Sequence, residues 1–352
     1  MNVVDAPLAS SELTSGRLPR FAPVIAGVVA LGIGVLLGEV IIGGGLAGTA
    51  VFSGLAYLVL LPLWYLAVEG RRAAVDRLVT SLVWGTLLVA LVPLVSLLYT
   101  VVRHGAPQIN GTFLGQDAFI LALHQPTGIL HAIVGTLVIT VAAALMSVPL
   151  GIFAAIYLIE YGAGSKLAAA IRFLVDVMTG IPSIVAGLFA FSLFTLLFGA
   201  AYRSGFGGAA ALSLLMVPIV VRSTEEMLRL VPNELREAAY ALGTPKWRTI
   251  VKVVLPTALG GIVTGVTLAI ARVVGETAPL LLIAGLTTKV NWNVFDGFMT
   301  TLPVLVYSSQ AKGHPEDFDV AWGAAFVLVL IVLVLNIVAR IIGKIFAPKT
   351  GH

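Results

Sequence analysis

The sequence predicts an all-α, polytopic transmembrane helical bundle, on the evidence of its composition, its long apolar segments and the placement of its charges. Of the 352 residues, 59% are hydrophobic and 11% are charged, and the mean hydropathy is +1.05. Soluble domains contain about 45–50% apolar residues. A chain with this composition is therefore expected in a membrane.

The chain has no cysteine, and its five histidines are scattered without the spacing of metal ligands. Disulfides and thiolate-metal sites are therefore excluded, and we expect neither a metal site nor a catalytic residue. The formal net charge of +4 does not indicate a nucleic-acid partner, because no run of Lys and Arg is dense enough for such binding. In a membrane protein this excess is typical of cytoplasmic loops.

Eight apolar segments are candidate membrane-spanning helices, which need about 20 residues to cross a hydrocarbon core about 30 Å thick. They are 23–42, 46–68, 78–102, 131–159, 167–198, 208–222, 258–286 and 321–345. The sixth is short, so we expect its helix to continue into the polar residues that follow. No cleavage site follows a short apolar core, so we expect the first segment to be kept as an anchor.

The first two segments form a Gly-rich pair whose only charge is Glu39. We expect them to be an appended hairpin over 23–70, preceded by a tail over 1–22. The other six segments carry every other charge found within an apolar segment. They are expected to form the functional core over 75–345, followed by a tail over 346–352.

Lys and Arg collect in alternate connections between the apolar segments. Cytoplasmic connections are enriched in these residues, so both termini and residues 225–252 are predicted to be cytoplasmic. Residues 103–130 and 287–320 are predicted to lie outside.

Residues 232–255 predict a cytoplasmic helix–turn–helix. The apolar residues of each half recur at i, i+3, i+4 and i+7, which is one helix face: Leu235, Ala238, Ala239 and Leu242, then Trp247, Ile250, Val251 and Val254. Between them, Gly243 is typical of the left-handed residue that ends a helix, and Thr244-Pro245 of an N-cap and first helical position. We interpret the pair as a compact knob that docks on a partner. The alternative is a helix pair lying on lipid, which the nearby acids disfavour at an anionic surface.

Ionisable residues within spans are costly and usually face a cavity or a partner. Arg272 and Glu276 are four residues apart, so we expect them on one face near the middle of a continuous helix. Arg172 and Asp176 have the same spacing, and residues 179–183 then interrupt their helix. These charges also have purely structural explanations. Arg272 with Glu276, and Arg172 with Asp176, could each form an ion pair within one helix, and the Arg222 side chain could extend to the membrane surface.

The functional interpretation is an anion route. Arg donates from a planar guanidinium that matches oxyanions, so Arg222 and Arg272 could hold a tetrahedral anion between helices. Glu276 would repel a fully ionised oxyanion but can accept a hydrogen bond from one that keeps a proton. Near neutral pH phosphate keeps a proton and sulfate does not, so this combination favours phosphate.

No G-x-x-x-x-G-K-[ST] loop occurs, so the chain has no recognisable means of binding the phosphates of ATP. Energy for transport would come from a partner or from a gradient. The segment 260–265 contains a G-x-x-x-G spacing, which is typical of close helix packing. This face could meet a homologous membrane subunit or another helix of the same core.

Two sets of motifs carry a resemblance to a known family. The sequence Glu237-Ala238-Ala239, then Gly243, then VVLP at 253–256 resembles the EAA loop of ABC-importer permeases, with Val253 where that motif usually has Ile. The segments TGIPSIVAGLFAF, VPIVVRSTEEMLRLVPNELREAA and RVVGETAPL resemble the PstA-type permease subunits of phosphate ABC importers. The resemblance runs from about residue 75 to about residue 345, so the first two spans depart from the six-helix family core.

The resemblance implies a type I ABC importer permease core of six helices, with an N-terminal two-helix extension, in a bacterial inner membrane. It implies that Glu237, Ala238, Ala239 and Gly243 contact an ATPase, and that Arg222, Arg272 and Glu276 serve phosphate passage, with Arg172 and Asp176 as secondary candidates. The chain itself would be no enzyme and would bind no cofactor, because ATP and Mg²⁺ would be held by the partner ATPase. The implied partners are that ATPase dimer, a homologous second permease, an extracytoplasmic phosphate-binding protein, phosphate and membrane lipid.

Two other functions remain open at this point. A permease of the same architecture could carry sulfate or molybdate. A gradient-driven secondary transporter could use Arg272 and Glu276 as a proton relay, although we find none of the internal repeats that are common in such proteins.

Overall fold

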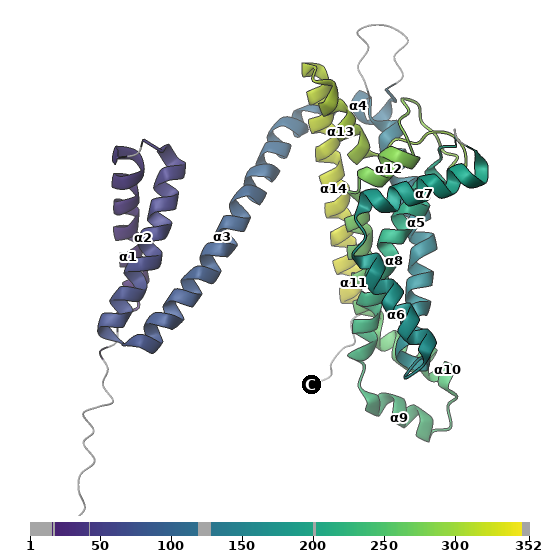
Figure 1. Ribbon diagram of the computed structural model, residues 1–352, viewed down its shortest axis with the longest axis horizontal. Coiled ribbons are helices and arrows are strands. Elements are labelled where there is room, and N and C mark those ends of the chain that lie inside the picture. Colours follow the sequence, from purple (N-terminus) through teal and green to yellow (C-terminus); the bar gives the residue numbers. More distant parts are fainter. Residues whose placement is uncertain (1–15, 17, 42, 119–127, 200–201, 347–352) are drawn as a thin grey trace, which may run out of the picture. The chain divides into compact units, whose positions relative to one another are not determined.

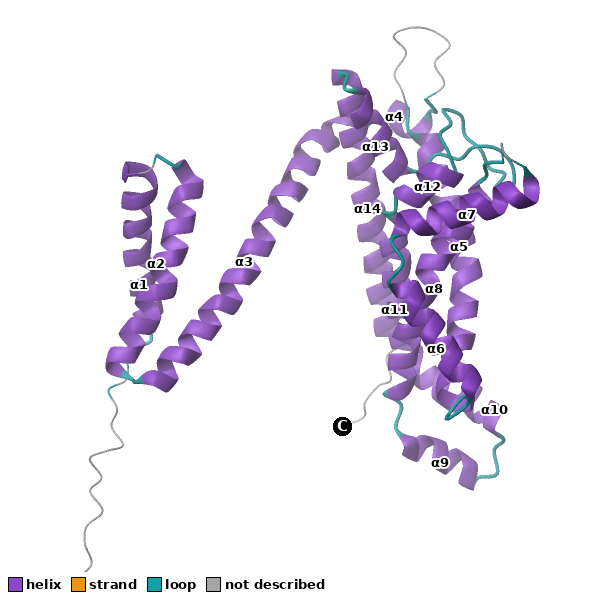
Figure 2. Cartoon of the chain, in the orientation of Figure 1, coloured by secondary structure: helices purple, strands orange, loops and turns teal. Residues whose placement is uncertain are grey.

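The computed structural model describes residues 16, 18–41, 43–118, 128–199 and 202–346. Within these ranges the structure is helical and has no strand (Figure 2). Among the described residues, seven helices are long and apolar enough to span a membrane, and a bent helix pair raises the number to as many as eight. The predicted all-α transmembrane fold class is confirmed. Most of the two predicted tails lies outside the described residues.

The chain divides into two compact units, residues 1–99 and 100–352 (Figure 1). The N-terminal unit holds α1 (Ala22–Val35), a π-helical extension (Leu36–Ile41), α2 (Gly45–Val68) and most of α3 (Arg71–Gly105). The C-terminal unit holds a 3₁₀ turn (Ala106–Gln108), α4 (Gly111–Gly115), α5 (Leu130–Ile156) with a π-helical end η4 (Tyr157–Tyr161), α6 (Lys166–Thr179), α7 (Ser183–Phe198), α8 (Gly205–Arg229), α9 (Asn233–Ala241), α10 (Lys246–Thr249), a π-helical turn η5 (Ile250–Val254), α11 (Leu255–Val274), α12 (Ala278–Ile283), α13 (Leu302–Lys312) and α14 (Pro315–Phe346).

In the N-terminal unit, α1 and α2 form a tight antiparallel hairpin because glycines let their backbones meet. A Cβ atom on Gly34 would lie 2.6 Å from the backbone nitrogen of Ser53, which no side chain tolerates. Glu39 lies in the π-helical extension and is exposed. The Gly-rich composition seen in the sequence thus has a packing reason.

In the C-terminal unit, α8 is the central helix (Figure 1) and packs against α5, α6, α7, α11 and α12. Its contact with α5 is close, since a Cβ atom on Gly151 would lie 2.7 Å from Val220 Cγ1. The largest apolar core lies between α5, α8 and α11 and includes Ile139, Leu212, Met216, Val220, Ala269 and Val273. The short sixth segment continues as a helix to Arg229, as the sequence predicts.

Two predicted spans are interrupted by non-helical residues. The fifth segment, 167–198, consists of α6 and α7, whose axes differ by 109°. The break lies within 179–183, where interruption was expected, because Pro182 has an extended backbone (φ −59°, ψ 140°) that a helix cannot contain.

The seventh segment was predicted as one helix over 258–286, and this prediction is wrong. The helix ends at Val274, residues 275–277 are non-helical, and α12 starts at Ala278. Pro279 lies in the first turn of α12, where a missing backbone N–H costs no hydrogen bond. The apolar run continues through this break, which is why hydropathy alone does not detect it.

The predicted helix–turn–helix is present, with one correction. Gly243 has φ +74°, and the N–H groups of Gly243 and Thr244 bond the carbonyls of Tyr240 and Ala239, which is the Schellman pattern. The second helix begins after Pro245, which itself occupies the cap position expected for Thr244. This second helix is continuous with the span that follows, because Lys246–Val274 forms one span. Pro256 lies in the first turn of α11, directly after the π-helical turn, where it is accommodated.

Candidate functional site

A pocket of about 260 Å³ lies where the two broken helices meet α8. Its lining comes from the α6–α7 break, from α8 around Pro218, and from the end of α11. The lining residues are Met178, Thr179, Ile181, Pro182, Ser183, Leu215, Pro218, Ile219, Arg272, Val273 and Glu276. Backbone groups freed at helix breaks and a small set of polar side chains are typical of substrate sites within membrane bundles.

Arg272 and Glu276 both line this pocket, although they do not share a helix. Arg272 lies in the last turn of α11 and is exposed, whereas Glu276 follows the helix end and is half-buried. The backbone N–H of Glu276 bonds the carbonyl of Val273 at 3.1 Å, which holds the turn. No ion pair or hydrogen bond joins the two side chains in the described structure, so the structural alternative of an ion pair within one helix is wrong. The expectation that both residues lie on one continuous helix is also wrong, because α11 ends at Val274. The guanidinium and the carboxylate remain available to a ligand.

A second charged cluster joins α6 to α8. The Arg222 guanidinium bonds Asp176 of α6 and lies 3.4 Å from Glu225 Oε2. Glu225, whose side chain is 3% exposed, also pairs with Arg229 at 2.8 Å and with Arg172 Nε at 3.4 Å. The structural alternative of an ion pair between Arg172 and Asp176 inside α6 is therefore wrong, because each binds a partner on α8 instead. Arg222 does not line the 260 Å³ pocket, so Arg222 and Arg272 are not brought together around one anion there.

The sequence singled out neither Arg229 nor the central Glu225 of this cluster. Glu225 lies four residues after buried Val221 and three before buried Leu228, which is the inward face of α8. This spacing from buried apolar residues could have indicated that Glu225 points into the bundle. Its position among several charged residues near the end of the span made it look like a surface residue instead.

The knob presents a mixed surface. Glu237, Ala238 and Gly243 are exposed, whereas Ala239 is buried. Leu242 is 86% exposed beside the glycine turn, and Trp247 is exposed at the start of the next helix. Large apolar side chains that stand out on a charged surface are typical of a docking site.

The chain is similar in sequence to known transport proteins. Residues 147–352 match the family model described as "Binding-protein-dependent transport system inner membrane component". The chain belongs to this family. It is 46% identical over 274 residues, 77% of this chain and 88% of the relative, to "Phosphate transport system permease protein PstA 1" of Mycobacterium tuberculosis (strain ATCC 25618 / H37Rv). It is 39% identical, over 77% of this chain and 94% of the relative, to "Phosphate transport system permease protein PstA" of Haemophilus influenzae.

A solved structure supports the fold of this inner membrane component. A chain from an inward-facing MetNI methionine ABC transporter superposes with a TM-score of 0.52 at 19% identity, covering 62% of this chain and 96% of that chain. At this identity the likeness concerns the fold alone, which is that of ABC importer permeases.

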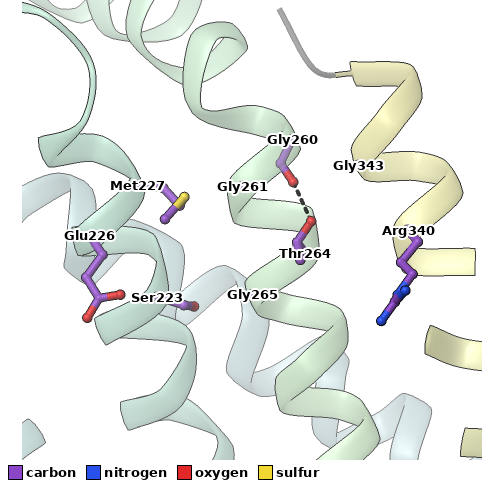
Figure 3. Close-up of a pocket in the computed structure, with 9 residues that line it drawn as sticks. All are labelled: Ser223, Glu226, Met227, Gly260, Gly261, Thr264, Gly265, Arg340 and Gly343. Atoms are coloured by element: carbon purple, nitrogen blue, oxygen red, sulfur yellow. Dashed lines mark hydrogen bonds between the residues drawn. The ribbon is translucent and has the colours of Figure 1, made fainter. Parts of the chain in front are cut away.

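A larger pocket of this inner membrane component, about 590 Å³, lies between α8, α11 and α14 (Figure 3). Its lining residues are Ser223, Glu226, Met227, Gly260, Gly261, Thr264, Gly265, Arg340 and Gly343. Figure 3 shows Glu226 and Arg340 on opposite sides of the labelled α11 residues. A Cβ atom on Gly265 would lie 2.6 Å from Ser223 Cβ, so the G-x-x-x-G face packs on α8 within the same core. This pocket contains neither Arg272 nor Glu276.

Proposed function

We propose that this chain is the permease subunit of an ATP-driven importer of inorganic phosphate. The main observation in support is the pocket that Arg272 and Glu276 both line without pairing with each other. This pocket occurs in a chain that belongs to a family of transport proteins. The names of the relatives, which are phosphate transport permeases, support the same substrate.

The chemistry of the pocket fits phosphate. The Arg272 guanidinium would donate to two oxygens of the anion, and charge-assisted bonds of this kind are roughly twice as strong as neutral ones. The Glu276 carboxylate would accept a hydrogen bond from the P–O–H group that phosphate keeps near neutral pH. Sulfate has no proton to donate and would be repelled.

Arg222 would serve as a second station on the same route, with Asp176 as its resident counter-ion. The exposure of both side chains, 40% for Arg222 and 61% for Asp176, supports access by a passing anion. Arg172 would act indirectly, because it pairs with the buried Glu225 that also holds Arg222.

The chain would form half of the route, opposite a homologous second permease, and an extracytoplasmic phosphate-binding protein would deliver the substrate. Glu237, Ala238 and Gly243, which are exposed, would contact a separate ATPase dimer that holds ATP and Mg²⁺, whereas the buried Ala239 would support them from the inner face of α9. The knob and both termini would be cytoplasmic, as the distribution of Lys and Arg supports.

The test is ATP-dependent phosphate uptake by vesicles that contain the chain with its partner subunits, comparing Arg272→Ala with the parent. Loss of a charged hydrogen bond of about 1.5–3 kcal/mol predicts at least about a tenfold fall in uptake at low phosphate. Arg340→Ala is the matched control, because Arg340 is an exposed arginine of a spanning helix that lines the other pocket. Equal uptake by Arg272→Ala and the parent would remove the anion route from this helix, and no uptake by the parent would refute the function.

A further inference from the structure

Arg236, which directly precedes Glu237 of the knob, is half-buried against groups from η4 and from the end of α8. Its Nε and Nη2 atoms lie 3.1 and 2.9 Å from Glu160 Oε1. Its Nη1 donates to the carbonyl of Val231 at 2.7 Å, and Nη2 also donates to that of Leu228 at 3.0 Å. The two side chains are only 13% and 5% exposed, so this ion pair is shielded from water.

The partners of Arg236 belong to the two most closely packed helices of the bundle. Glu160 lies in η4, at the end of α5, while Leu228 is in the last turn of α8 and Val231 just follows it. Arg236 itself lies in α9. One side chain therefore joins the knob to the ends of both α5 and α8.

Apolar packing does little to hold α9 in place. Ala239 is the one buried residue that the described α9 contributes, and its side chain is a single methyl group. A neighbouring contact is also electrostatic, since Lys246 lies 4.9 Å from the centre of the Tyr161 ring, next to Glu160. The charge-assisted hydrogen bonds of Arg236 are thus the main side-chain connection between α9 and the bundle.

The helix whose last turn Arg236 contacts, α8, also reaches the candidate anion pocket. Leu215, Pro218 and Ile219 of α8 line that pocket. A displacement of α9 would pull on the last carbonyls of α8 and on η4, and helices packed as closely as α5 and α8 move as rigid bodies.

We propose that Arg236 and Glu160 are positioning residues for energy coupling, which transmit movement of the docked knob to α5 and α8. This inference rests on the proposed function, because it needs an ATPase that moves the knob. It assigns the transmission step to a buried ion pair that touches neither the substrate nor the exposed docking surface.

The experiment uses the complete complex in vesicles and measures phosphate uptake and ATP hydrolysis in the same sample. In Arg236→Gln and in Glu160→Gln, we expect the amount of phosphate moved per ATP hydrolysed to fall about tenfold, because the hydrogen bonds that are lost are charge-assisted. The rate of ATP hydrolysis should stay within about twofold of the parent. Arg236→Lys keeps the charge but not the planar set of donors, so it should lie between the parent and Arg236→Gln. Arg340→Gln is the matched control, since Arg340 is an exposed arginine of α14, outside the knob and outside both charged clusters.

The double variant Glu160→Arg with Arg236→Glu restores a pair of opposite charges and should recover part of the coupling. An unchanged ratio of phosphate to ATP in the single variants would overturn the proposal. The proposal would also be overturned if Arg236→Lys and the double variant both failed to assemble into the complex to the same extent. That result would mean that the pair only supports the fold. Absence of ATP-dependent uptake in the parent would instead refute the proposed function.

Discussion

At the residue scale, charged side chains of the bundle differ in whether they already have partners. Arg272 and Glu276 face a pocket unpaired, whereas Arg172, Arg222 and Arg229 surround Glu225. A free charge inside a membrane protein is costly unless water or a ligand reaches it. The unpaired set is therefore the first candidate for substrate contact, whereas the paired set fixes α6 against α8 and leaves the half-exposed Arg222 as the second candidate.

Replacing Glu276 by Gln should lower phosphate uptake about tenfold, because a neutral acceptor replaces a carboxylate in a bond to the P–O–H group. Sulfate should also become a better competitor, since the repelling charge is gone. The measurement is uptake of labelled phosphate with increasing sulfate, with Glu226→Gln as the control outside this pocket. Unchanged uptake and unchanged competition would remove Glu276 from the argument for phosphate.

Replacing Glu225 by Gln should destabilise the protein by about 3 kcal/mol, because three guanidinium groups lose their shared buried carboxylate. The midpoint of thermal unfolding in detergent measures this effect. The neighbouring Glu226 is exposed, so Glu226→Gln should leave the midpoint in place. Equal midpoints for the two variants would show that the cluster contributes little to stability.

At the element scale, breaks in helices shape the candidate site. The α6–α7 break was foreseen from Gly180 and Pro182, but the α11–α12 break was not, although Gly275 and Pro279 flank it. An apolar run that continues on both sides conceals a break, since hydropathy averages over the whole segment. The turn at Gly243 was foreseen correctly because the left-handed residue is a glycine and Thr244-Pro245 follow it directly.

Replacing Gly243 by Ala should weaken association with the ATPase about fivefold. An L-residue at φ +74° costs about 1 kcal/mol or more, and no atom lies within 4 Å of an added Cβ, so strain and not a clash is the cause. Asn tolerates this backbone conformation better, so Gly243→Asn should bind more tightly than Gly243→Ala. Copurification with the ATPase at graded concentrations measures the difference, and the reverse order would contradict the backbone explanation.

At the scale of the whole molecule, the chain combines an N-terminal unit of α1, α2 and most of α3 with a C-terminal bundle of ABC importer permease fold. We predict that α1 and α2 cross the membrane twice and so leave the orientation of the bundle unchanged. If the bent α6–α7 pair counts as one crossing, the chain has eight, and the knob and both termini are predicted to share one side of the membrane.

The absence of cysteine makes this orientation testable, since a single introduced thiol is then the only one. Leu242→Cys, in the knob, should react with a membrane-impermeant reagent in inside-out vesicles and not in intact cells. Trp292→Cys is its counterpart, because Trp292 is 73% exposed in the segment predicted to lie outside, and it should react in intact cells. Labelling of Leu242→Cys from outside would reverse the topology.

The sequence by itself determined the membrane class, most of the helices, the knob and the set of intramembrane charges. These features depend on windows of about 20 residues or fewer, within which helix formation and membrane insertion are decided. The tertiary structure alone decided which charges pair. Arg222 meets Asp176 46 residues away, and Arg236 meets Glu160 across 76 residues. Such partners follow from how helices pack, and a local pattern in the chain carries no record of that packing.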